Sequence, residues 1–200
     1  MPNRKPTKRE MTSARRKDAI LAAAVSCIIQ NGYHQTGVRD IAKKADVSLG
    51  NLYNYFSGKA DVLAEIARIE RAELEPFMKI LDKEAPAIEL LEEFIPAYTR
   101  HLAKPETIIL ALEITLEAIR EIEIADLFTE SRNTLIAGIA AVLRRGAKEG
   151  CLRQMQSYSE TAQFVLEIME GTAFRHGIED VELKALVENE LEFIRAAIAA

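Results

Sequence analysis

The sequence predicts an all-α protein of about nine helices, with a three-helix unit at the N-terminus and a larger helical unit after it. Three observations predict this fold class. Apolar residues recur at intervals of three and four along most of the chain, two short helical patterns before residue 59 are separated by only four residues, and no strand-like alternation occurs after residue 59. The length of 200 residues suits one large domain or two modest ones.

The N-terminal segment predicts a basic arm followed by a helix. Residues 1–13 contain four Lys and Arg residues, two prolines and no apolar periodicity, which is typical of a disordered arm that adds phosphate or minor-groove contacts. A helix is expected over 13–31, because Ile20, Ala24 and Ile28 form an apolar stripe at intervals of four. Gly32 follows at the position where a helix commonly ends.

Two short helices are expected next. Thr36 is an N-cap residue type before the first of them, and Ser48 is another before the second. Leu52 and Phe56, four residues apart, give the second helix an inward side. Because residues 45–48 are all that separate the two helices, they must cross steeply. This geometry is that of a helix-turn-helix, whose second helix can enter a DNA major groove.

The outward face of the second helix carries no acidic side chain and no long flexible one. Gly50 costs about 1 kcal/mol of helix stability relative to alanine, which indicates that a partner approaches the backbone there. Asparagine can pair with adenine, leucine can pack on a thymine methyl, and tyrosine hydroxyls can donate to phosphates. A surface helix with two chance aromatic residues is the alternative. The predicted phosphate contacts are Thr36, Arg39, Ser48, Tyr53, Tyr55 and Lys59, and the predicted groove-floor residues are Leu49, Gly50, Asn51 and Asn54.

After Lys59 the chain reads as helical almost throughout. A long helix over 59–83 should bend or break at Pro76, and a second over 86–103 should kink at Pro96. The remaining helices are expected over 105–121, 124–149, 159–176 and 182–199.

The last two predicted helices are apolar on two faces, so one face can serve the subunit's own core and the other needs a partner. A symmetric dimer through a four-helix bundle would bury both apolar faces, and a buried three-layer monomer is the alternative. A dimer would place two recognition helices about one DNA turn apart on a two-fold site. The predicted interface residues are Phe164, Ile168, Gly171, Thr172, Leu186, Leu191 and Ile194.

Charge is divided unevenly along the chain. Through residue 59 there are eleven Lys and Arg against four Asp and Glu, and from residue 60 on there are fifteen against twenty-seven. A basic first third on an acidic remainder suits a DNA-binding head on a body that DNA does not touch. No apolar run approaches the roughly 18 residues of a membrane span, and no signal peptide is evident. Two cysteines form neither a disulfide framework nor a metal motif, so we expect a cytoplasmic protein without a cofactor or metal.

Residues 15–59 resemble the N-terminal DNA-binding domain of the TetR family of one-component transcriptional regulators. The whole ordered series over this stretch is more specific than any single short motif within it. The matching residues are Ile20, Leu21, Ala23, Ala24, Gly32, Tyr33, Thr36, Val38, Arg39, Asp40, Ile41, Ala42, Ala45, Val47, Ser48, Gly50, Asn51, Leu52, Tyr53, Phe56 and Lys59. The resemblance implies a DNA-binding domain over 14–59 and a ligand-sensing and dimerisation domain over 60–200.

The resemblance also implies a small-molecule pocket in the body, whose occupation pulls the connecting helix so that the two heads no longer fit adjacent grooves. Glu113 and Glu117 lie one turn apart and could receive a cationic ligand, or they form a solvated face paired with Arg120 or Arg132. Candidate pocket residues are Phe94, Tyr98, His101, Glu113, Glu117, Phe128, Arg132, Phe164 and Glu167.

The sequence therefore predicts a homodimeric repressor that binds a two-fold symmetric double-stranded DNA operator and is released by an unidentified small molecule, with no membrane partner. A constitutive or architectural DNA-binding protein without an effector remains open, and so does activation in place of repression. An enzyme is disfavoured, because the chain has no phosphate-binding glycine loop, no nucleophile elbow and no metal-ligand spacing among its three histidines.

Overall fold

The protein is all-α, as the sequence predicts. The structure, a computed structural model, describes residues 8–179 and 181–200. Within these residues it has ten helices: α1 (Lys8–Asn31), α2 (Val38–Lys44), α3 (Leu49–Tyr53), α4 (Lys59–Ala72), α5 (Glu75–Leu81), α6 (Ala87–Leu102), α7 (Pro105–Arg120), α8 (Ile122–Glu149), α9 (Tyr158–His176) and α10 (Leu183–Ile198).

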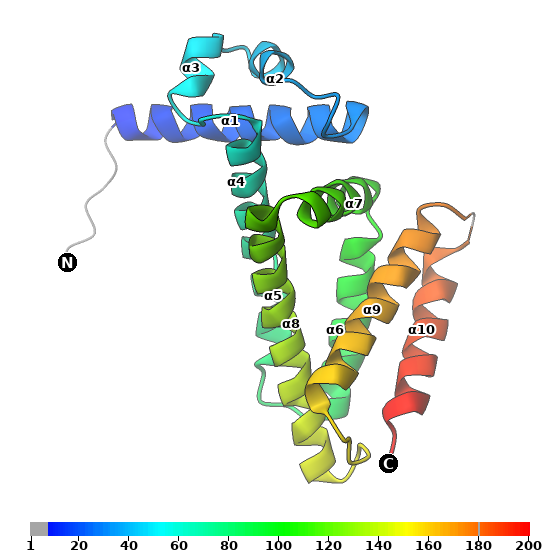
Figure 1. Ribbon diagram of the computed structural model, residues 1–200. Coiled ribbons are helices and arrows are strands. Elements are labelled where there is room, and N and C mark those ends of the chain that lie inside the picture. The colour runs from blue at the N-terminus through cyan, green and yellow to red at the C-terminus, as the bar shows by residue number, and fades with distance from the viewer. Residues whose placement is uncertain (1–7, 180) are drawn as a thin grey trace, which may run out of the picture.

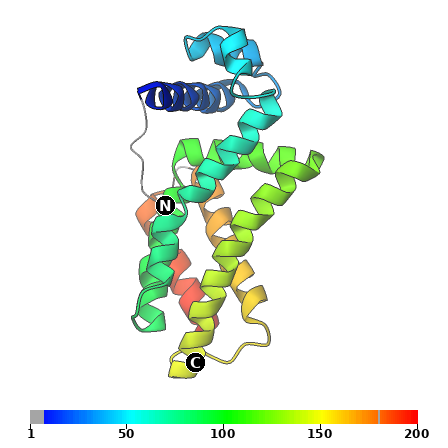
Figure 2. The same ribbon diagram turned by 90° about the vertical axis from the view of Figure 1, so that its left-hand side faces the viewer.

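The helices form a small head and a taller body. In Figure 1, α1 lies across the top of the molecule with α2 and α3 above it, and α4 descends from this head into the body. The body helices α5, α6, α8, α9 and α10 run mainly along the long axis, whereas α7 crosses the upper end of the body beneath α1. The view at right angles shows the same separation of head and body (Figure 2).

One sequence-based expectation is confirmed and another is wrong. The helix over 59–83, which was expected to bend or break at Pro76, is divided into α4 and α5, with Pro76 in the first turn of α5, where proline's missing N–H costs nothing. This break raises the number of described helices from the expected nine to ten. Helix α1 begins at Lys8, so residues 8–13 are helical and do not belong to a disordered arm. The first seven residues of that predicted arm lie outside the described residues.

Two hydrophobic cores support this arrangement. The lower core joins α5, α6, α8, α9 and α10, and Phe94, Ile139 and Met169 are fully buried in it. The upper core holds the head together, but it also contains residues of α4 and α7, including Leu63 and Ile114. The head is therefore packed directly on the top of the body, and residue 59 is not a boundary in packing.

Gly146 in α8 gives a testable measure of how closely the lower core is packed. A Cβ at this position would lie 2.4 Å from Leu152 Cδ1 and 3.0 Å from Ala87 Cβ. Because both neighbours are buried, we expect Gly146→Ala to lower the free energy of unfolding by about 1–3 kcal/mol in urea denaturation. Gly50→Ala is the matched control, since its Cβ would meet nothing within 4 Å. Equal stability of the two variants would contradict the prediction.

Candidate functional site

Helix α3 is the recognition helix of the predicted helix-turn-helix, and its N-terminus is capped as expected. The Ser48 hydroxyl accepts a hydrogen bond from the Asn51 N–H at 3.1 Å. Leu52 and Phe56 are almost fully buried and anchor α3 to the core of the head. The helix ends at Tyr53, so Asn54 is its C-cap residue.

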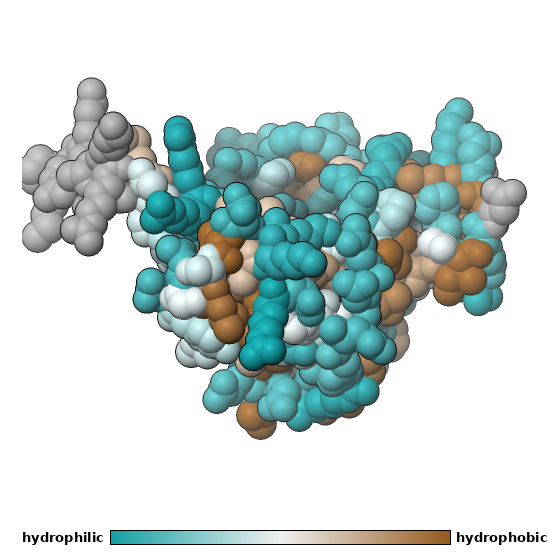
Figure 3. Space-filling model, turned by 90° about the horizontal axis from the view of Figure 1, so that it is seen from above, coloured by the Kyte–Doolittle hydropathy of each residue, from teal (hydrophilic) through white to brown (hydrophobic). Residues whose placement is uncertain are grey.

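The predicted DNA-contacting residues fall into two groups by exposure. Arg39, Ser48, Gly50, Tyr53 and Asn54 are exposed and lie on α2 or α3 or directly beside them. The half-buried group, which is held partly by contacts inside the head, consists of Leu49, Asn51, Tyr55 and Lys59. Seen from above, the face that carries α2 and α3 is mainly hydrophilic with a few apolar side chains among the polar ones (Figure 3).

Thr36 was expected to cap α2 and to donate to a phosphate, and this expectation is wrong. The N-cap residue of α2 is Gly37, whose N–H donates to the Asp40 carboxylate at 2.9 Å. Thr36 is 1% exposed, and its hydroxyl donates inward to the Gly32 carbonyl at 2.8 Å. The physical reason is that Thr36 ends the preceding turn, so its short side chain closes that turn and faces away from solvent.

Several half-buried residues of the head have partners within it. The Lys59 ammonium donates to the Tyr33 carbonyl at 2.8 Å and lies 4.2 Å from the centre of the Tyr33 ring. The Tyr55 hydroxyl accepts from Ser13 Oγ at 3.3 Å. By contrast, Asn51 Oδ1 is buried and has no hydrogen-bond partner in the part of the chain that the structure describes.

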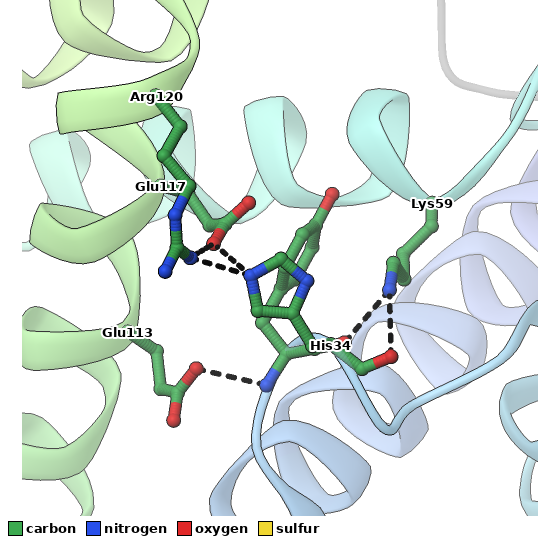
Figure 4. A network of polar contacts seen from close by, with 6 residues as sticks. His34, Lys59, Glu113, Glu117 and Arg120 are labelled. Atoms are coloured by element: carbon green, nitrogen blue, oxygen red, sulfur yellow. Dashed lines mark hydrogen bonds and ion pairs between the residues drawn. The ribbon is translucent and has the colours of Figure 1, made fainter.

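A cluster of polar contacts joins the head to α7, and we call it the junction (Figure 4). The Tyr33 N–H donates to Glu113 Oε2 at 2.8 Å. His34 Nε2 lies 2.8 Å from Glu117 Oε1, which also accepts from Arg120 at 2.7 Å. Glu117 is 4% exposed, so the junction holds a buried carboxylate between head and body.

The junction corrects the expectation that Glu113 and Glu117 face a ligand pocket. Together with Arg120 they form one stripe of α7, which faces the head. A second stripe of the same helix, Thr107, Ala111, Ile114 and Thr115, lines the cavity described next. The two stripes differ by only part of a turn, and periodicity alone does not say which of them meets a pocket.

A cavity of about 250 Å³ lies inside the body between α4, α6, α7, α8 and α9. Four predicted pocket residues line it, namely Tyr98, His101, Phe128 and Arg132. The complete lining is Ala67, Glu70, Arg71, Leu74, Tyr98, His101, Leu102, Thr107, Ala111, Ile114, Thr115, Phe128, Ser131, Arg132, Leu135, Glu170 and Phe174.

Three other predicted pocket residues lie outside the lining. Phe94 is fully buried in the lower core behind Tyr98, against which its ring stacks at 5.5 Å. Phe164 is 64% exposed on the outer face of α9. Glu167 is exposed, and its Oε1 lies 3.9 Å from Arg132 Nη2.

Sequence reasoning missed two carboxylates of the lining, Glu70 and Glu170. A signal for both was present, because Glu70 follows Ile66 by four residues on α4 and Glu170 follows Leu166 by four on α9. Each therefore interrupts an inward apolar stripe. Burial, reinforced by the nearby charge of Glu73, raises the pKa of Glu70 to about 7.

The other ionisable groups of the lining are paired or neutral. Arg132 donates to both carboxylate oxygens of Glu170, while burial still raises the pKa of Glu170. Arg71 pairs with Glu130 at 2.6 Å. Burial lowers the pKa of His101, which favours its neutral form at neutral pH.

The residues predicted at a dimer interface lie on α9 and α10 and differ in exposure, and one of them is buried. Phe164 is exposed, Gly171 is exposed with open space around it, and Ile168 and Leu191 are half-buried against the lower core. Thr172 and Leu186 are also half-buried. Ile194, expected at the interface, is 1% exposed and belongs to the subunit's own core.

The neighbouring Phe193 is 61% exposed and was not predicted at this surface. Further exposed apolar residues, Ile178 and Val181, lie between α9 and α10, where Figure 3 shows apolar side chains at the end of the molecule. No described helix is long and apolar enough to cross a membrane. Within the described residues no group of three or more His, Cys, Asp or Glu side chains is arranged to hold a metal ion.

A helix-turn-helix head packed on a helical body with an internal cavity defines a transcriptional regulator that reads DNA with one part and has room for a small molecule in the other. The family described as bacterial regulatory proteins, tetR family, matches residues 20–66. The chain is a transcriptional regulator of the TetR family. This family consists of regulators and not of enzymes, which confirms the non-enzymatic interpretation.

Similarity to known regulators extends over most of the chain. The fatty acid metabolism regulator protein of Bacillus subtilis is 25% identical over 182 residues, which cover 90% of this chain and 93% of that protein. The structure of Bacillus subtilis FadR in complex with stearoyl-CoA has a TM-score of 0.79 at 25% identity, covering 90% of this chain and 98% of that chain. A regulator from Saccharomonospora viridis in complex with choline has a TM-score of 0.80 at 22% identity, covering 94% of this chain and 99% of that chain, and it shares the fold.

Proposed function

We propose that this regulator is a homodimeric repressor that binds a two-fold symmetric DNA operator and leaves it when a small molecule occupies the body cavity. One observation carries the proposal. Helix α7 lines the cavity with one stripe and holds the head through the junction with the other. Any ligand that displaces α7 therefore also displaces the head, whose position determines whether both recognition helices fit the operator.

We assign DNA contacts to the exposed residues of the head. We assign phosphate contacts to the side chains of Arg39, Tyr53 and Ser48, which can donate hydrogen bonds to phosphate oxygens. We assign a contact with a base edge to Asn54, whose amide can both donate and accept hydrogen bonds. Gly50 supports the same assignment, since the fold leaves open space where its side chain would lie and does not itself require glycine. The half-buried Leu49, Asn51, Tyr55 and Lys59 would reach DNA only by small movements of their side chains.

Relatives support the release of DNA by a ligand. The similar Bacillus subtilis regulator FadR was crystallised with stearoyl-CoA, and the regulator from Saccharomonospora viridis with choline. A cavity with an apolar wall and a few polar groups is typical of ligand sites in proteins. A regulator of this kind works where chromosomal DNA is, which favours a cytoplasmic protein. A constitutive DNA-binding protein would retain its operator affinity across a broad panel of metabolites.

The first experiment is binding of the purified protein to the DNA that flanks its own gene, compared with a scrambled duplex at several salt concentrations. Binding of one dimer that prefers the native duplex and persists near physiological salt would support the proposal. Equal binding to both duplexes that disappears with salt would mean that the head holds this DNA only through phosphates, and would contradict an operator at this locus.

Two substitutions on α3 should separate phosphate contacts from base contacts. We expect Tyr53→Phe to weaken binding to operator and scrambled DNA by the same factor, because a lost phosphate contact costs about 1 kcal/mol whatever the sequence. Asn54→Ala should weaken the operator more than scrambled DNA, since a lost base contact is worth about 1–3 kcal/mol of discrimination. Fluorescence anisotropy measures the affinity of each variant for the operator and for the scrambled duplex. Tyr158→Phe, in the body, is the control, and equal losses for both α3 variants would contradict the assignment.

A further inference from the structure

Glu70 is the one charged side chain of the cavity lining that has no partner in the described part of the chain. It projects from the last full turn of α4, and no hydrogen bond or ion pair joins it to any described residue. Glu70 is half-buried, and a carboxylate that is partly shielded from water and has no protein partner is costly, because its charge is only partly compensated. Such a group in a cavity wall is available to pair with a bound molecule.

The positive charges near the cavity are already neutralised. Arg132 donates to both carboxylate oxygens of Glu170 and has Glu167 within 3.9 Å. Arg71 is occupied by Glu130 at 2.6 Å. An anionic ligand would have to displace one of these carboxylates, whereas a cation meets Glu70 directly. Among the described residues of the lining, the charge left without a counter-ion is therefore the negative charge of Glu70.

The rest of the lining suits the apolar body of a cation. Tyr98, Phe128 and Phe174 present aromatic side chains, and His101 adds a fourth ring. Tyr98 is held in place by Phe94 and by an edge contact with Phe77 at 5.0 Å. Aromatic faces attract cations, most strongly where water is excluded.

We propose that the cavity binds a lipophilic organic monocation, an amine or quaternary ammonium group on an apolar body, with Glu70 as its counter-ion. This inference deepens the proposed ligand-responsive function and rests on it only for the consequence of binding, because the cation site itself can be tested without DNA. It also transfers to Glu70 the role that the sequence had suggested for Glu113 and Glu117.

The affinity for such a cation should depend on pH through Glu70. The carboxyl is largely protonated below its pKa of about 7 and ionised above it, so binding strengthens as pH rises. The other titratable or charged groups of the lining are Arg71 from α4, Tyr98 and His101 from α6, Arg132 from α8 and Glu170 from α9. Glu73, the C-cap residue of α4, lies near Glu70, and the α7 wall is uncharged. His101 would oppose cation binding only at low pH, where it becomes charged.

Isothermal titration calorimetry on the full-length protein tests the proposal with four probes that share one apolar body. They are phenylbutyltrimethylammonium, phenylbutylamine, phenylbutanol and phenylbutyrate, which differ in charge at the head group. We expect both cations to bind about tenfold or more tightly than phenylbutanol, and phenylbutyrate to bind most weakly. Binding of the quaternary cation should strengthen by up to about tenfold between pH 6 and pH 8.

Glu70→Gln should lower the affinity for both cations by about tenfold, leave phenylbutanol unchanged and remove the pH dependence. Glu89→Gln is the control, since it removes the same charge from an exposed site of α6 that does not line the cavity. Circular dichroism of both variants checks that they fold. Unchanged cation affinity in Glu70→Gln, or pH dependence that persists in it, would overturn the role of Glu70.

The outcomes also separate this inference from the proposed function. Preferential binding of phenylbutyrate or phenylbutanol, accompanied by operator release, would overturn the cation site and uphold the ligand-responsive regulator. Cation binding through Glu70 without operator release would uphold the site and overturn the ligand-responsive regulator. Failure of all four probes to bind would overturn the cation site.

Discussion

Replacing Phe164 and Phe193 together by glutamate should convert the protein into a monomer and weaken operator binding at least about a hundredfold. The two rings are 64% and 61% exposed on α9 and α10, where apolar side chains of this size need a partner. A second copy related by two-fold symmetry supplies one, because the same surface then meets itself. Linking two DNA-binding heads gains about 10²–10⁴-fold in affinity over one head, and that factor is lost with the dimer.

Light scattering coupled to gel filtration measures the mass, and anisotropy with full-site and half-site duplexes measures binding. The double variant should bind a half-site as well as the wild type does, since its heads are unchanged. Ile122→Glu is the matched control, because Ile122 is also strongly exposed, at 78%, but belongs to the start of α8 and not to α9 or α10. A double variant that remains a dimer would show that these faces do not form the interface.

Much of the fold follows from local rules that the sequence displays openly. Apolar periodicity and the prolines predict the helices from α6 onward to within two residues at each end, and Gly32 predicts the end of α1. Ser48 as a cap and the inward Leu52 and Phe56 predict the recognition helix, because capping and core packing are local properties. The two-faced pattern of α9 is also confirmed, with Val165 in the core and Phe164 exposed.

What the sequence does not predict is which neighbour each stripe meets. On α7 the stripe of Glu113 and Glu117 meets the head, and the stripe of Ala111 and Thr115 meets the cavity. On α10 a shift of one residue, about a quarter turn, exchanges the buried Ile194 for the exposed Phe193. Such choices depend on how helices cross in three dimensions, and a single sequence records only the period within each helix.

The double substitution Glu113→Ala and Glu117→Gln should leave ligand affinity of the free protein unchanged and remove most of the ligand's effect on DNA binding. Neither side chain lines the cavity, whereas both hold the head to α7. Coupling between two sites typically amounts to about 5–150-fold in affinity, and we expect the ratio of operator affinities with and without ligand to fall from this range toward one. The ligand is whichever probe or metabolite releases the wild type from its operator.

Linkage makes this prediction stricter than a simple loss of response. The factor by which a ligand weakens operator binding must equal the factor by which the operator weakens ligand binding, so calorimetry with and without DNA has to report the same loss of coupling.

Hydrogen exchange gives a local measure of the same substitution, since the Tyr33 N–H that donates to Glu113 should exchange with solvent faster in the variant. Glu106→Ala, exposed in the first turn of the same helix, should preserve both coupling and exchange. The prediction would be contradicted if the ligand still fully released the double variant from DNA while the Tyr33 amide exchanged fast. That result would show that the junction can be broken without changing the response to the ligand. The signal must in that case pass from the cavity along α4, whose Ala67 and Glu70 also line the wall and whose first residue holds Tyr33.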